Sequence, residues 1–463
     1  MSRLFISAAR KSSGKTSISI GLCAALRHRG LNIQPFKKGP DYIDPHWLAL
    51  ASARPCYNLD FYTMDRDEIL QTVASRSAGA DISLIEGNKG LYDGLDLDGS
   101  NSNAALAELL NTPVVLVLDA RGMTRGIAPL ILGYQAFDRN IDIRGVILNK
   151  LGGFRHESKL RDVIEHYTDV KVVGAVHQDA RFSIEERHLG LVPGHEDSAA
   201  SAKIAQLREA VQEQVDLDTL VDIARDAPPL PTLTLPEIRP VEPARQAEVR
   251  IGIVKNAAFG FYYPDDLEAL ENAGATLVDI DNLTATTLAD VDGLFIGGGF
   301  PETHMQALEA NHGFRVQLKQ AIDDGLPVYA ECGGLMYLAR SITWKNERRE
   351  MVGAIDGDIV MEDRPQGRGY AQLQENPQGL WPSPGGDVIP CHEFHYSRFI
   401  NLDKNARFAY RVLRGTGING ENDGYIRKNM LACYIHQRNT RKNHWAQRFV
   451  AFVLQTRKQA AQP

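Results

Sequence analysis

A proline-rich stretch divides this chain into two parts. Residues 228–243 read PPLPTLTLPEIRPVEP and hold six prolines in sixteen positions. Proline lacks a backbone N–H and fixes φ, so this density excludes helix and interior strand and favours an extended linker, with a proline-rich recognition segment as the alternative. The chain has 463 residues, which is too long for one ordinary core. The sequence therefore predicts a first domain over 1–200, a helix and linker over 201–247, and a second domain over 248–463.

The composition argues against several classes of protein. The apolar fraction of 43% is ordinary for a globular protein, and the net charge of −7 gives no basic signature for nucleic acid. No apolar stretch reaches the ~18 residues of a membrane span, and the first residues lack the apolar core of a signal peptide. The five cysteines form no CxxC pair, which weakens a zinc or redox interpretation. We expect a cytoplasmic protein that binds neither nucleic acid nor membrane.

Both domains alternate β-rich apolar runs with helical patterns. In the first domain, strands are expected over 3–8, 81–87, 113–120 and 144–150, and helices over 17–30 and 103–111. In the second, strands are expected over 249–256, 275–280, 293–299 and 327–332, and helices over 263–274 and 286–291. This alternation is typical of α/β folds and predicts a doubly wound parallel sheet in the first domain.

The first predicted strand leads into a phosphate-binding loop, AARKSSGKTS (8–17). In such a P-loop the backbone N–H groups face phosphate oxygens, Lys15 reaches the β- and γ-phosphates, and Thr16 can hold Mg²⁺. Ala9 stands where the standard motif has its first glycine, but the position between strand and helix supports the assignment. The residues expected to bind ATP are Ser13, Gly14, Lys15, Thr16 and Ser17.

Acidic and basic residues follow at two expected strand ends. The stretch FKKGPDYIDP (36–45) carries Asp41 and Asp44, and Glu86 ends the buried run over 81–87. Carboxylates at the carboxyl ends of parallel strands line the ligand crevice of such sheets, and hard oxygen ligands suit Mg²⁺ bound to phosphates. The expected metal ligands are Thr16, Glu86 and Asp41. Two lysines, Lys37 and Lys38, either neutralise a phosphate or carboxylated substrate or are solvated surface residues.

The second domain contains a candidate nucleophile, Cys332, in LPVYAECGGLMYL (326–338). A strand, a tight turn and a helix form a nucleophile elbow, which exposes the side chain at the bend. His436 ends another apolar run and is the expected base, while His392 and His395 are assigned structural or substrate-positioning roles. Backbone N–H groups of an oxyanion hole are expected from Gly298, Gly299 and Gly333.

The motifs together resemble the cobyrinic acid a,c-diamide synthase family, which are ATP-dependent class I glutamine amidotransferases acting on cyclic tetrapyrroles. The resemblance spans essentially the whole chain. It rests on KKGPDYIDP (37–45), RPCYNLD (54–60), EGNKGLYDG (86–94), VILNKLGGFRH (146–156), ERHLGLVP (186–193), GGGFPE (297–302), AECGGLMYL (330–338) and HEFHYS (392–397).

The resemblance implies a carbon–nitrogen ligase with an N-terminal P-loop synthetase domain and a C-terminal class I glutamine amidotransferase domain. Cys332 would attack the side-chain amide of glutamine, His436 would move protons, and the released ammonia would amidate the a and c acetate groups of the tetrapyrrole. ATP and Mg²⁺ would first convert each carboxylate into an acyl phosphate. Asp41 and Asp44 would lie at that activation site, and Tyr42 and Ile43 would help to choose the side chain. The sequence leaves open whether the protein forms a homodimer.

Departures from the family pattern leave alternatives. Related amidotransferases often carry a glutamate two residues after the histidine; here that residue is Arg438, which predicts a Cys–His dyad. The polar Asn88 and Lys89 keep sirohaem or a metallated sirohydrochlorin, including nickel sirohydrochlorin, open as the substrate. A third, remote alternative is a P-loop positioning ATPase without amidation activity, since Arg10 occupies the place of the signature lysine in those proteins.

Overall fold

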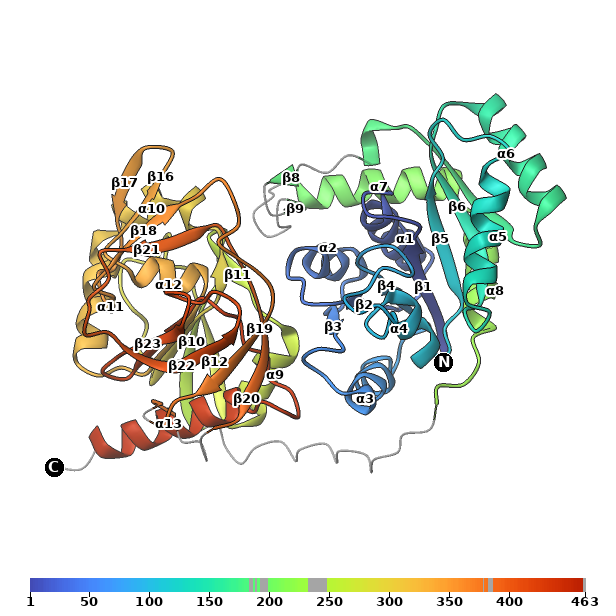
Figure 1. Ribbon diagram of the computed structural model, residues 1–463. Helices are drawn as coiled ribbons and strands as arrows, with labels where there is room; N and C mark the ends of the chain where they lie inside the picture. Colours follow the sequence, from blue (N-terminus) through green and yellow to red (C-terminus); the bar gives the residue numbers. More distant parts are fainter. Residues whose placement is uncertain are drawn as a thin grey trace. The chain divides into compact units, whose positions relative to one another are not determined.

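The computed structural model describes residues 1–182, 186–187, 190–191, 199–231, 248–377, 379–381 and 386–460. The chain divides into two compact units, Met1–Glu237 and Ile238–Pro463, and each has its own sheet and helices (Figure 1). The helical segment after residue 200 belongs to the first unit. Most of the proline-rich linker, and half of the ERHLGLVP motif, lie outside the described residues.

The first unit is built on a seven-stranded sheet with the order β3-β2-β4-β1-β5-β6-β7, and all of its pairings are parallel. Its strands are β1 (Ser2–Ala8), β2 (Ile33–Lys38), β3 (Tyr57–Leu59), β4 (Ile82–Glu86), β5 (Val114–Asp119), β6 (Ile143–Leu151) and β7 (Lys171–His177). They are continuous buried runs, as expected when helices cover both faces of a parallel sheet. The predicted doubly wound parallel sheet is therefore confirmed.

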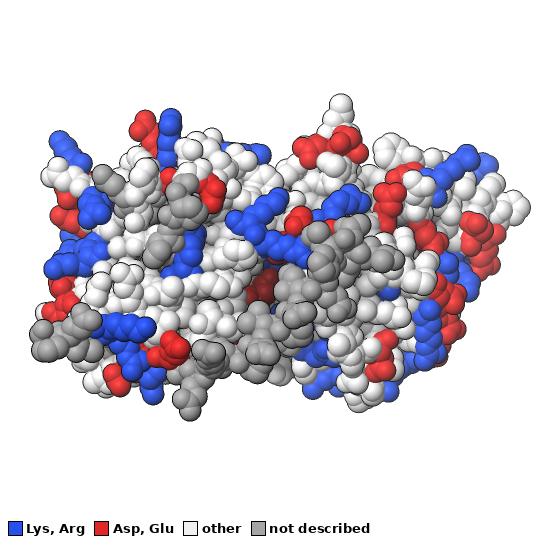
Figure 2. All heavy atoms as spheres, turned by 90° about the horizontal axis from the view of Figure 1, so that it is seen from below, with Lys and Arg blue, Asp and Glu red and all other residues white. Residues whose placement is uncertain are grey.

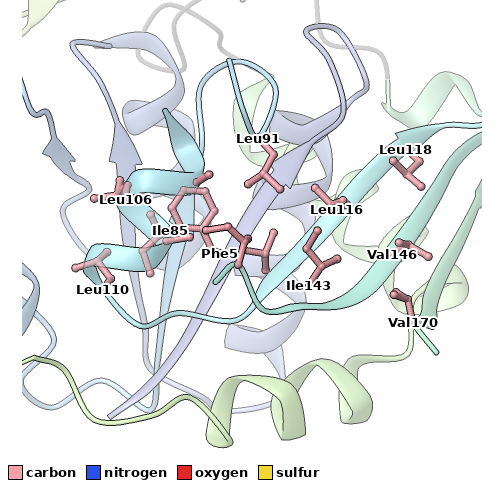
Figure 3. Close-up of a cluster of buried hydrophobic side chains, with 14 of the residues drawn as sticks. Phe5, Ile85, Leu91, Leu106, Leu110, Leu116, Leu118, Ile143, Val146 and Val170 are labelled. Atoms are coloured by element: carbon pink, nitrogen blue, oxygen red, sulfur yellow. The ribbon is translucent and has the colours of Figure 1, made fainter. Parts of the chain in front are cut away.

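The helices of the first unit are α1 (Lys15–His28), α2 (Ile43–Ser52), α3 (Arg66–Arg76), α4 (Asn103–Leu109), α5 (Ile127–Phe137), α6 (Phe154–Tyr167), α7 (Ala200–Gln214) and α8 (Leu217–Arg225). A short 3₁₀ turn, η1 (Ala180–Phe182), and a two-stranded ladder, β8 (Glu186–Arg187) with β9 (Gly190–Leu191), lie between β7 and α7. One core joins sheet side chains such as Phe5, Ile85 and Leu116 to Leu106 and Leu110 beside α4 (Figure 3). Helix α7 packs against α1, and α8 packs against β1.

The second unit contains a nine-stranded mixed sheet with the order β12-β10-β13-β15-β24-β23-β22-β19-β20. The first five strands of that order are parallel and the remaining pairings are antiparallel. Its strands are β10 (Val249–Val254), β12 (Ala275–Ile280), β13 (Gly293–Ile296), β15 (Val328–Glu331), β19 (Gly367–Glu375), β20 (Val388–His395), β22 (Arg407–Arg414), β23 (Asn422–Arg427) and β24 (Met430–Cys433). The parallel half carries the predicted nucleophile at the end of β15.

Two smaller sheets accompany it, β11 (Phe259–Phe261) with β14 (Gly298–Gly299), and β16 (Ser341–Trp344), β17 (Glu347–Glu350), β18 (Asp358–Met361) and β21 (Ser397–Ile400). The helices are α9 (Pro264–Asn272), η2 (Pro301–Thr303), α10 (Met305–Ala310), α11 (His312–Asp323), α12 (Gly333–Leu338) and α13 (Trp445–Ala460). Trp445, at the start of α13, is fully buried against the rings of Phe295 and Tyr329. This aromatic group anchors the last helix to the sheet.

The helix predicted over 286–291 is wrong. The segment has no regular secondary structure, and side chains bond to backbone groups just before it and within it. The carboxylate of Asp281 accepts from the backbone N–H of Leu283 and from the hydroxyl of Thr284, which closes a turn instead of opening a helix. The N–H of Leu288 donates to the side chain of Gln317 on α11. The other strands and helices that the sequence predicted are present.

One face of the molecule carries charged side chains of both signs. On the face drawn in Figure 2, the Lys and Arg side chains are mixed with Asp and Glu side chains among uncharged areas. Among the described helices, none is both long and apolar enough to cross a membrane.

Candidate active sites

The P-loop follows β1, the central strand of the first sheet, and leads into α1. Gly14 has a φ of 89°, a left-handed conformation that glycine adopts without strain. The Nδ2 atom of Asn149 donates to the carbonyl of Ser13 (2.7 Å), and the hydroxyl of Ser13 donates to the carbonyl of Arg10 (2.9 Å). These contacts fix the loop at the start of α1, where backbone N–H groups can bind phosphate.

Lys15, Thr16 and three residues from β2, α2 and β4 meet beside this loop. The Thr16 hydroxyl donates to Oε1 of Glu86 (2.8 Å) and lies 3.2 Å from Oδ2 of Asp44. Lys37 Nζ contacts the same Glu86 oxygen at 3.0 Å and the same Asp44 oxygen at 2.5 Å, and Lys15 Nζ lies 3.3 Å from Glu86. The P-loop and the carboxylates predicted at the strand ends therefore form one cluster.

The charges of this cluster shift one another's pKa values. Burial lowers the pKa of Lys37, but the negative charges of Asp44, Glu86 and Asp41 outweigh burial and hold that pKa well above its ordinary value. Burial also raises the pKa of Asp44, yet Lys37 and Lys15 bring it below the ordinary value. The pKa of Asp41 is raised to about 6 by burial and then by the charge of Asp44. Of these two aspartates, Asp41 is therefore the one that takes up a proton more easily.

The cluster fits a magnesium ion held through nucleotide phosphates. Glu86 is fully buried, and its second oxygen, Oε2, has no hydrogen-bond partner, an arrangement that a cation would satisfy. Within the described residues, no group of three or more His, Cys, Asp or Glu side chains is arranged to hold a metal ion. A site with one or two protein ligands is what Mg²⁺ usually has when phosphates supply the other oxygens.

The structure places the two predicted carboxylates, Asp41 and Asp44, in different surroundings. Asp44, rather than Asp41, lies beside the Thr16 hydroxyl. Asp41 Oδ1 accepts from the backbone N–H groups of Ile43 and Asp44, so it closes the turn before α2 instead of joining Thr16 and Glu86. We therefore regard Asp44 as the better candidate for the position assigned to Asp41.

The remaining predicted residues lie around this cluster. Lys37 and Lys38 are both buried, which rules out the solvated surface alternative for them. Lys38 Nζ donates to the carbonyl of Asn101 (2.7 Å), and its pKa is lowered to about 8 mainly by burial. Ser17 donates its hydroxyl to the carbonyl of Phe182 (2.9 Å), so that side chain is engaged within the protein. Tyr42 directly precedes α2, and Ile43 is buried at the start of that helix.

Cys332 lies at a sharp bend between β15 and α12, as the sequence predicted. Its φ of 47° and ψ of −102° are unusual for a residue with a side chain. The bend is held by a hydrogen bond from its own N–H to the carbonyl of Cys433 on β24 (2.7 Å). At Gly334, a Cβ atom would lie 2.2 Å from the carbonyl oxygen of Ile296, so the turn requires glycine there. This strand–turn–helix geometry is that of a nucleophile elbow.

His436 follows β24 and is buried beside Cys332. Burial lowers the pKa of its imidazole, but the charge of Cys332, the hydrogen bond to Cys332 and the contact with Glu331 outweigh burial and raise that pKa to about 10. The Nδ1 atom of His436 lies 3.2 Å from Oε2 of Glu331. The structure thus places an acid–base pair, Cys332 and His436, with a carboxylate behind the histidine.

The predicted oxyanion glycines surround the same pair. A Cβ atom at Gly298 would lie 2.8 Å from Cε1 of His436, and one at Gly333 would lie 2.9 Å from the backbone nitrogen of Gly299. Gly299 has a φ of 159°, close to extended, and its Cβ would collide with the carbonyl of Ala258. The strand β14 and the elbow therefore approach each other at backbone distance, where donors for an oxyanion can converge.

His392 and His395, the two other histidines expected near this site, contact neighbouring aromatic rings. His392 exchanges backbone hydrogen bonds with His436, and the two imidazole rings stack with centroids 4.9 Å apart. Burial lowers the pKa of His392 well below its ordinary value, and the charges of His436 and Arg438 lower it further. His395 stacks on Tyr434 at 4.1 Å. A neutral His392 therefore packs against the imidazole of His436.

Comparisons with known proteins match both units of the chain. Residues 250–444 match the model of a CobB/CobQ-like glutamine amidotransferase domain, and residues 2–185 match that of an AAA domain. The chain is 44% identical over 466 residues to the cobyrinate a,c-diamide synthase of Magnetococcus marinus. The alignment covers 100% of this chain and 99% of that protein. It is 41% identical to the enzyme of that name from Methanosarcina acetivorans, covering 94% of this chain and 92% of that protein.

The chain belongs to the cobyrinate a,c-diamide synthase family. A third relative of that name, from Archaeoglobus fulgidus, is 40% identical over 97% of this chain and 96% of its own. The protein is accordingly an ATP-dependent ligase with a glutamine amidotransferase domain, and the predicted fold class of both units is confirmed.

In this member of the family, the sequence reasoning missed Glu331. Because Arg438 stands two residues after His436, the sequence predicted a dyad, but the structure supplies a carboxylate from the residue before the nucleophile. Oε1 of Glu331 accepts from the N–H of Gln437 (2.9 Å) and from the hydroxyl of Tyr329, which fixes the carboxylate. Arg438 instead donates to Asp265 on α9 (2.7 Å). The only sequence signal was the acidic residue in the ECGG motif.

Proposed function

We propose that this protein amidates the a and c acetate side chains of cobyrinate, using ATP and glutamine, through an acyl-phosphate intermediate. Three relatives named cobyrinate a,c-diamide synthase match more than nine-tenths of the chain, and the geometry of the two candidate sites supports such a reaction. The structural observation that best supports the proposal is the geometry of the candidate site in the second unit. Cys332 at a strained bend lies beside His436, and His436 is held by Glu331.

In the second unit, the Cys332 thiolate attacks the side-chain amide carbon of glutamine. The tetrahedral oxyanion faces the backbone at Gly298, Gly299 and Gly333, and His436 protonates the leaving nitrogen, so ammonia departs and a glutamyl thioester remains. Water, deprotonated by His436, then hydrolyses the thioester to glutamate. Glu331 holds the imidazole in one orientation throughout.

In the first unit, the substrate carboxylate attacks the terminal phosphorus of ATP, and the bond from that phosphorus to the bridging oxygen breaks to release ADP. Lys15 and Lys37 neutralise charge at the phosphates, while Thr16, Glu86 and Asp44 are the residues that would hold Mg²⁺ there. The ion would supply electrostatic stabilisation of the phosphoryl oxygens. Ammonia then displaces phosphate from the acyl phosphate and forms the amide.

The substrate is tested with a panel of rings. We would incubate the protein with ATP, Mg²⁺ and glutamine, offer cobyrinate, sirohydrochlorin with and without metals, and sirohaem, and read the product masses. Two oxygens replaced by two NH groups on cobyrinate, a loss of about 2 Da relative to the diacid, would support the proposal. Amidation restricted to sirohaem or a metallated sirohydrochlorin would contradict the choice of ring and retain the chemistry. ATP hydrolysis without amidation of any ring would contradict the proposal as a whole.

A further inference from the structure

Asp119 contacts three cationic side chains beside the P-loop, those of Arg10, Arg121 and Lys150. We call these four residues the rim. Arg121 contacts both of its oxygens, with Nε at 2.9 Å from Oδ1 and Nη2 at 2.6 Å from Oδ2. Arg10, in the P-loop itself, places Nη2 at 3.2 Å from Oδ2, and Lys150, near the end of β6, lies 3.7 Å from the same oxygen. Three parts of the chain, the loop after β1, the residues just after β5 and the end of β6, therefore meet at one carboxylate.

The rim carries a surplus of positive charge. In the part of the chain that the structure describes, the ion pairs of Arg10, Arg121 and Lys150 all go to Asp119, so one negative charge faces three positive ones. The Asp119 side chain is 2% exposed, whereas those of Arg10 and Arg121 are 69% and 57% exposed. The carboxylate is thus fixed, and the two guanidinium groups can move into solvent or onto a ligand.

The same rim is connected to the backbone of the nucleotide loop. Lys150 Nζ donates to the carbonyl of Ser12 (2.8 Å), and the carbonyl of Arg10 accepts from the hydroxyl of Ser13. Ser12 and Lys150 both have positive φ values, 63° and 61°, which brings the loop and the end of β6 together. A polyphosphate bound by this loop would place its negative charge close to the surplus cations.

We propose that Arg10 and Arg121 leave Asp119 when ATP binds and hold the terminal phosphoryl group. An arginine fork bonds a carboxylate and a phosphoryl group with the same geometry. Arg121 already makes such a fork to Asp119 and Arg10 makes one contact to it, so Asp119 holds both side chains beside the loop. In the transfer step the terminal phosphorus bonds to the substrate oxygen, its bond to the bridging oxygen of ADP breaks, and no proton is required. The arginines stabilise the charge on the equatorial oxygens.

The role in transfer rests on the proposed function, but the binding step does not. We would measure the dissociation constants of ATP and ADP with Mg²⁺ for the wild type, Arg10→Gln and Arg121→Gln, by calorimetry and without any tetrapyrrole. A charge-assisted bond to the terminal phosphate predicts that each variant weakens ATP roughly 10-fold. ADP, which lacks that group, should change less than about 2-fold. Arg139→Gln, an exposed arginine in the same unit, is the matched control and should change neither constant.

Asp119→Asn tests the other half of the inference. Removing the carboxylate that competes for the arginines should strengthen ATP binding, whereas a purely structural Asp119 predicts weaker binding or none. An unchanged ratio of ATP to ADP affinity in both arginine variants would overturn the proposal even if Asp119→Asn does not fold.

A further measurement distinguishes the two anionic groups that the rim could bind, the terminal phosphate of ATP and a carboxylate of the tetrapyrrole. If the arginine variants raise only the KM for the carboxylated tetrapyrrole in ammonia-driven amidation, the rim binds substrate carboxylates and the proposal is wrong. If the wild type amidates no ring while the arginine variants still lose their preference for ATP, the proposed function fails and this inference stands.

Discussion

Nδ1 of His436 lies 3.2 Å from Oε2 of Glu331, and Glu331 directly precedes Cys332 in the chain. One strand, β15, therefore ends with the carboxylate that holds the base and is followed at once by the nucleophile that the base serves. Any shift of this strand end moves both groups together, which keeps the spacing between nucleophile and base insensitive to small motions of the sheet.

Replacing Glu331 by Gln should lower kcat for glutamine hydrolysis by roughly 10²-fold, because the imidazole loses the charge that orients it and stabilises its protonated form. The KM for glutamine should change little. Ammonia-driven amidation, which bypasses Cys332, should remain near the wild-type rate. Glu271→Gln, an exposed glutamate on α9, is the matched control. Equal losses in both reactions would show that Glu331 supports the fold instead.

Replacing Cys332 by Ala should abolish glutamine-dependent amidation and leave ammonia-dependent amidation intact, because the first unit needs only the ammonia. The measurement compares amide formation from glutamine with that from ammonium salt at about 10 mM, roughly tenfold above the upper end of ordinary KM values, at a pH where part of the ammonia is unprotonated. Persistent turnover with glutamine in Cys332→Ala would disprove the nucleophile assignment.

Much of the fold and of both sites could be predicted from local pattern. Continuous apolar runs predicted the strands of the parallel sheets. The elbow around Cys332 could also be predicted, because its strand, bend and glycines are contiguous in the chain. Glu331 could not be assigned to His436 in this way, since 105 residues separate them and the pairing depends on β15 lying beside β24. The exchange of Asp41 and Asp44 has a similar cause. The two carboxylates lie on one turn, and the turn geometry decides which of them reaches Thr16.

Gly298→Ala should block glutamine hydrolysis without breaking the fold of the second unit. Gly298 has no left-handed φ, so alanine is tolerated by the backbone, but its Cβ would lie 2.8 Å from Cε1 of His436. The collision displaces the imidazole or the oxyanion strand, and a loss of one oxyanion donor alone corresponds to about 10²–10³ in kcat. The melting temperature and the rate of glutamine hydrolysis would be compared with those of Gly313→Ala on α11, where there is more space. An active Gly298→Ala enzyme would place the oxyanion hole elsewhere.

Glu86→Gln should impair ATP use and spare glutamine hydrolysis. Glu86 Oε1 accepts from Thr16 and from two lysines while Oε2 has no partner, so the neutral amide removes the charge that balances Lys15 and Lys37 and that would bind Mg²⁺. We expect the concentration of Mg²⁺ for half-maximal ammonia-driven amidation to rise at least about 10-fold. Glu165→Gln, exposed on α6, serves as the control. An unchanged Mg²⁺ requirement would remove Glu86 from the metal site.

The pH dependence of stability should report on the pair of Cys332 and His436. The pKa of His436 is raised in the folded protein from 6.5 to about 10, although burial opposes the shift, because the charge of Cys332 outweighs it together with hydrogen bonds to Cys332 and Glu331. Folding therefore favours the protonated imidazole. The resulting stabilisation is complete below pH 6.5, declines as the pH rises above it, and is lost as the pH passes through about 10.

Two variants isolate this contribution. The difference in melting temperature between the wild type and His436→Gln should shrink steadily between pH 6.5 and 10. Cys332→Ala removes the charge of Cys332, the first of the causes that raise the pKa of His436. The imidazole of His436 should therefore titrate at a lower pH in this variant than in the wild type. Its NMR signal is assigned by its loss in His436→Gln. The same titration midpoint in both proteins would mean that Cys332 does not carry the charge that holds the proton on His436.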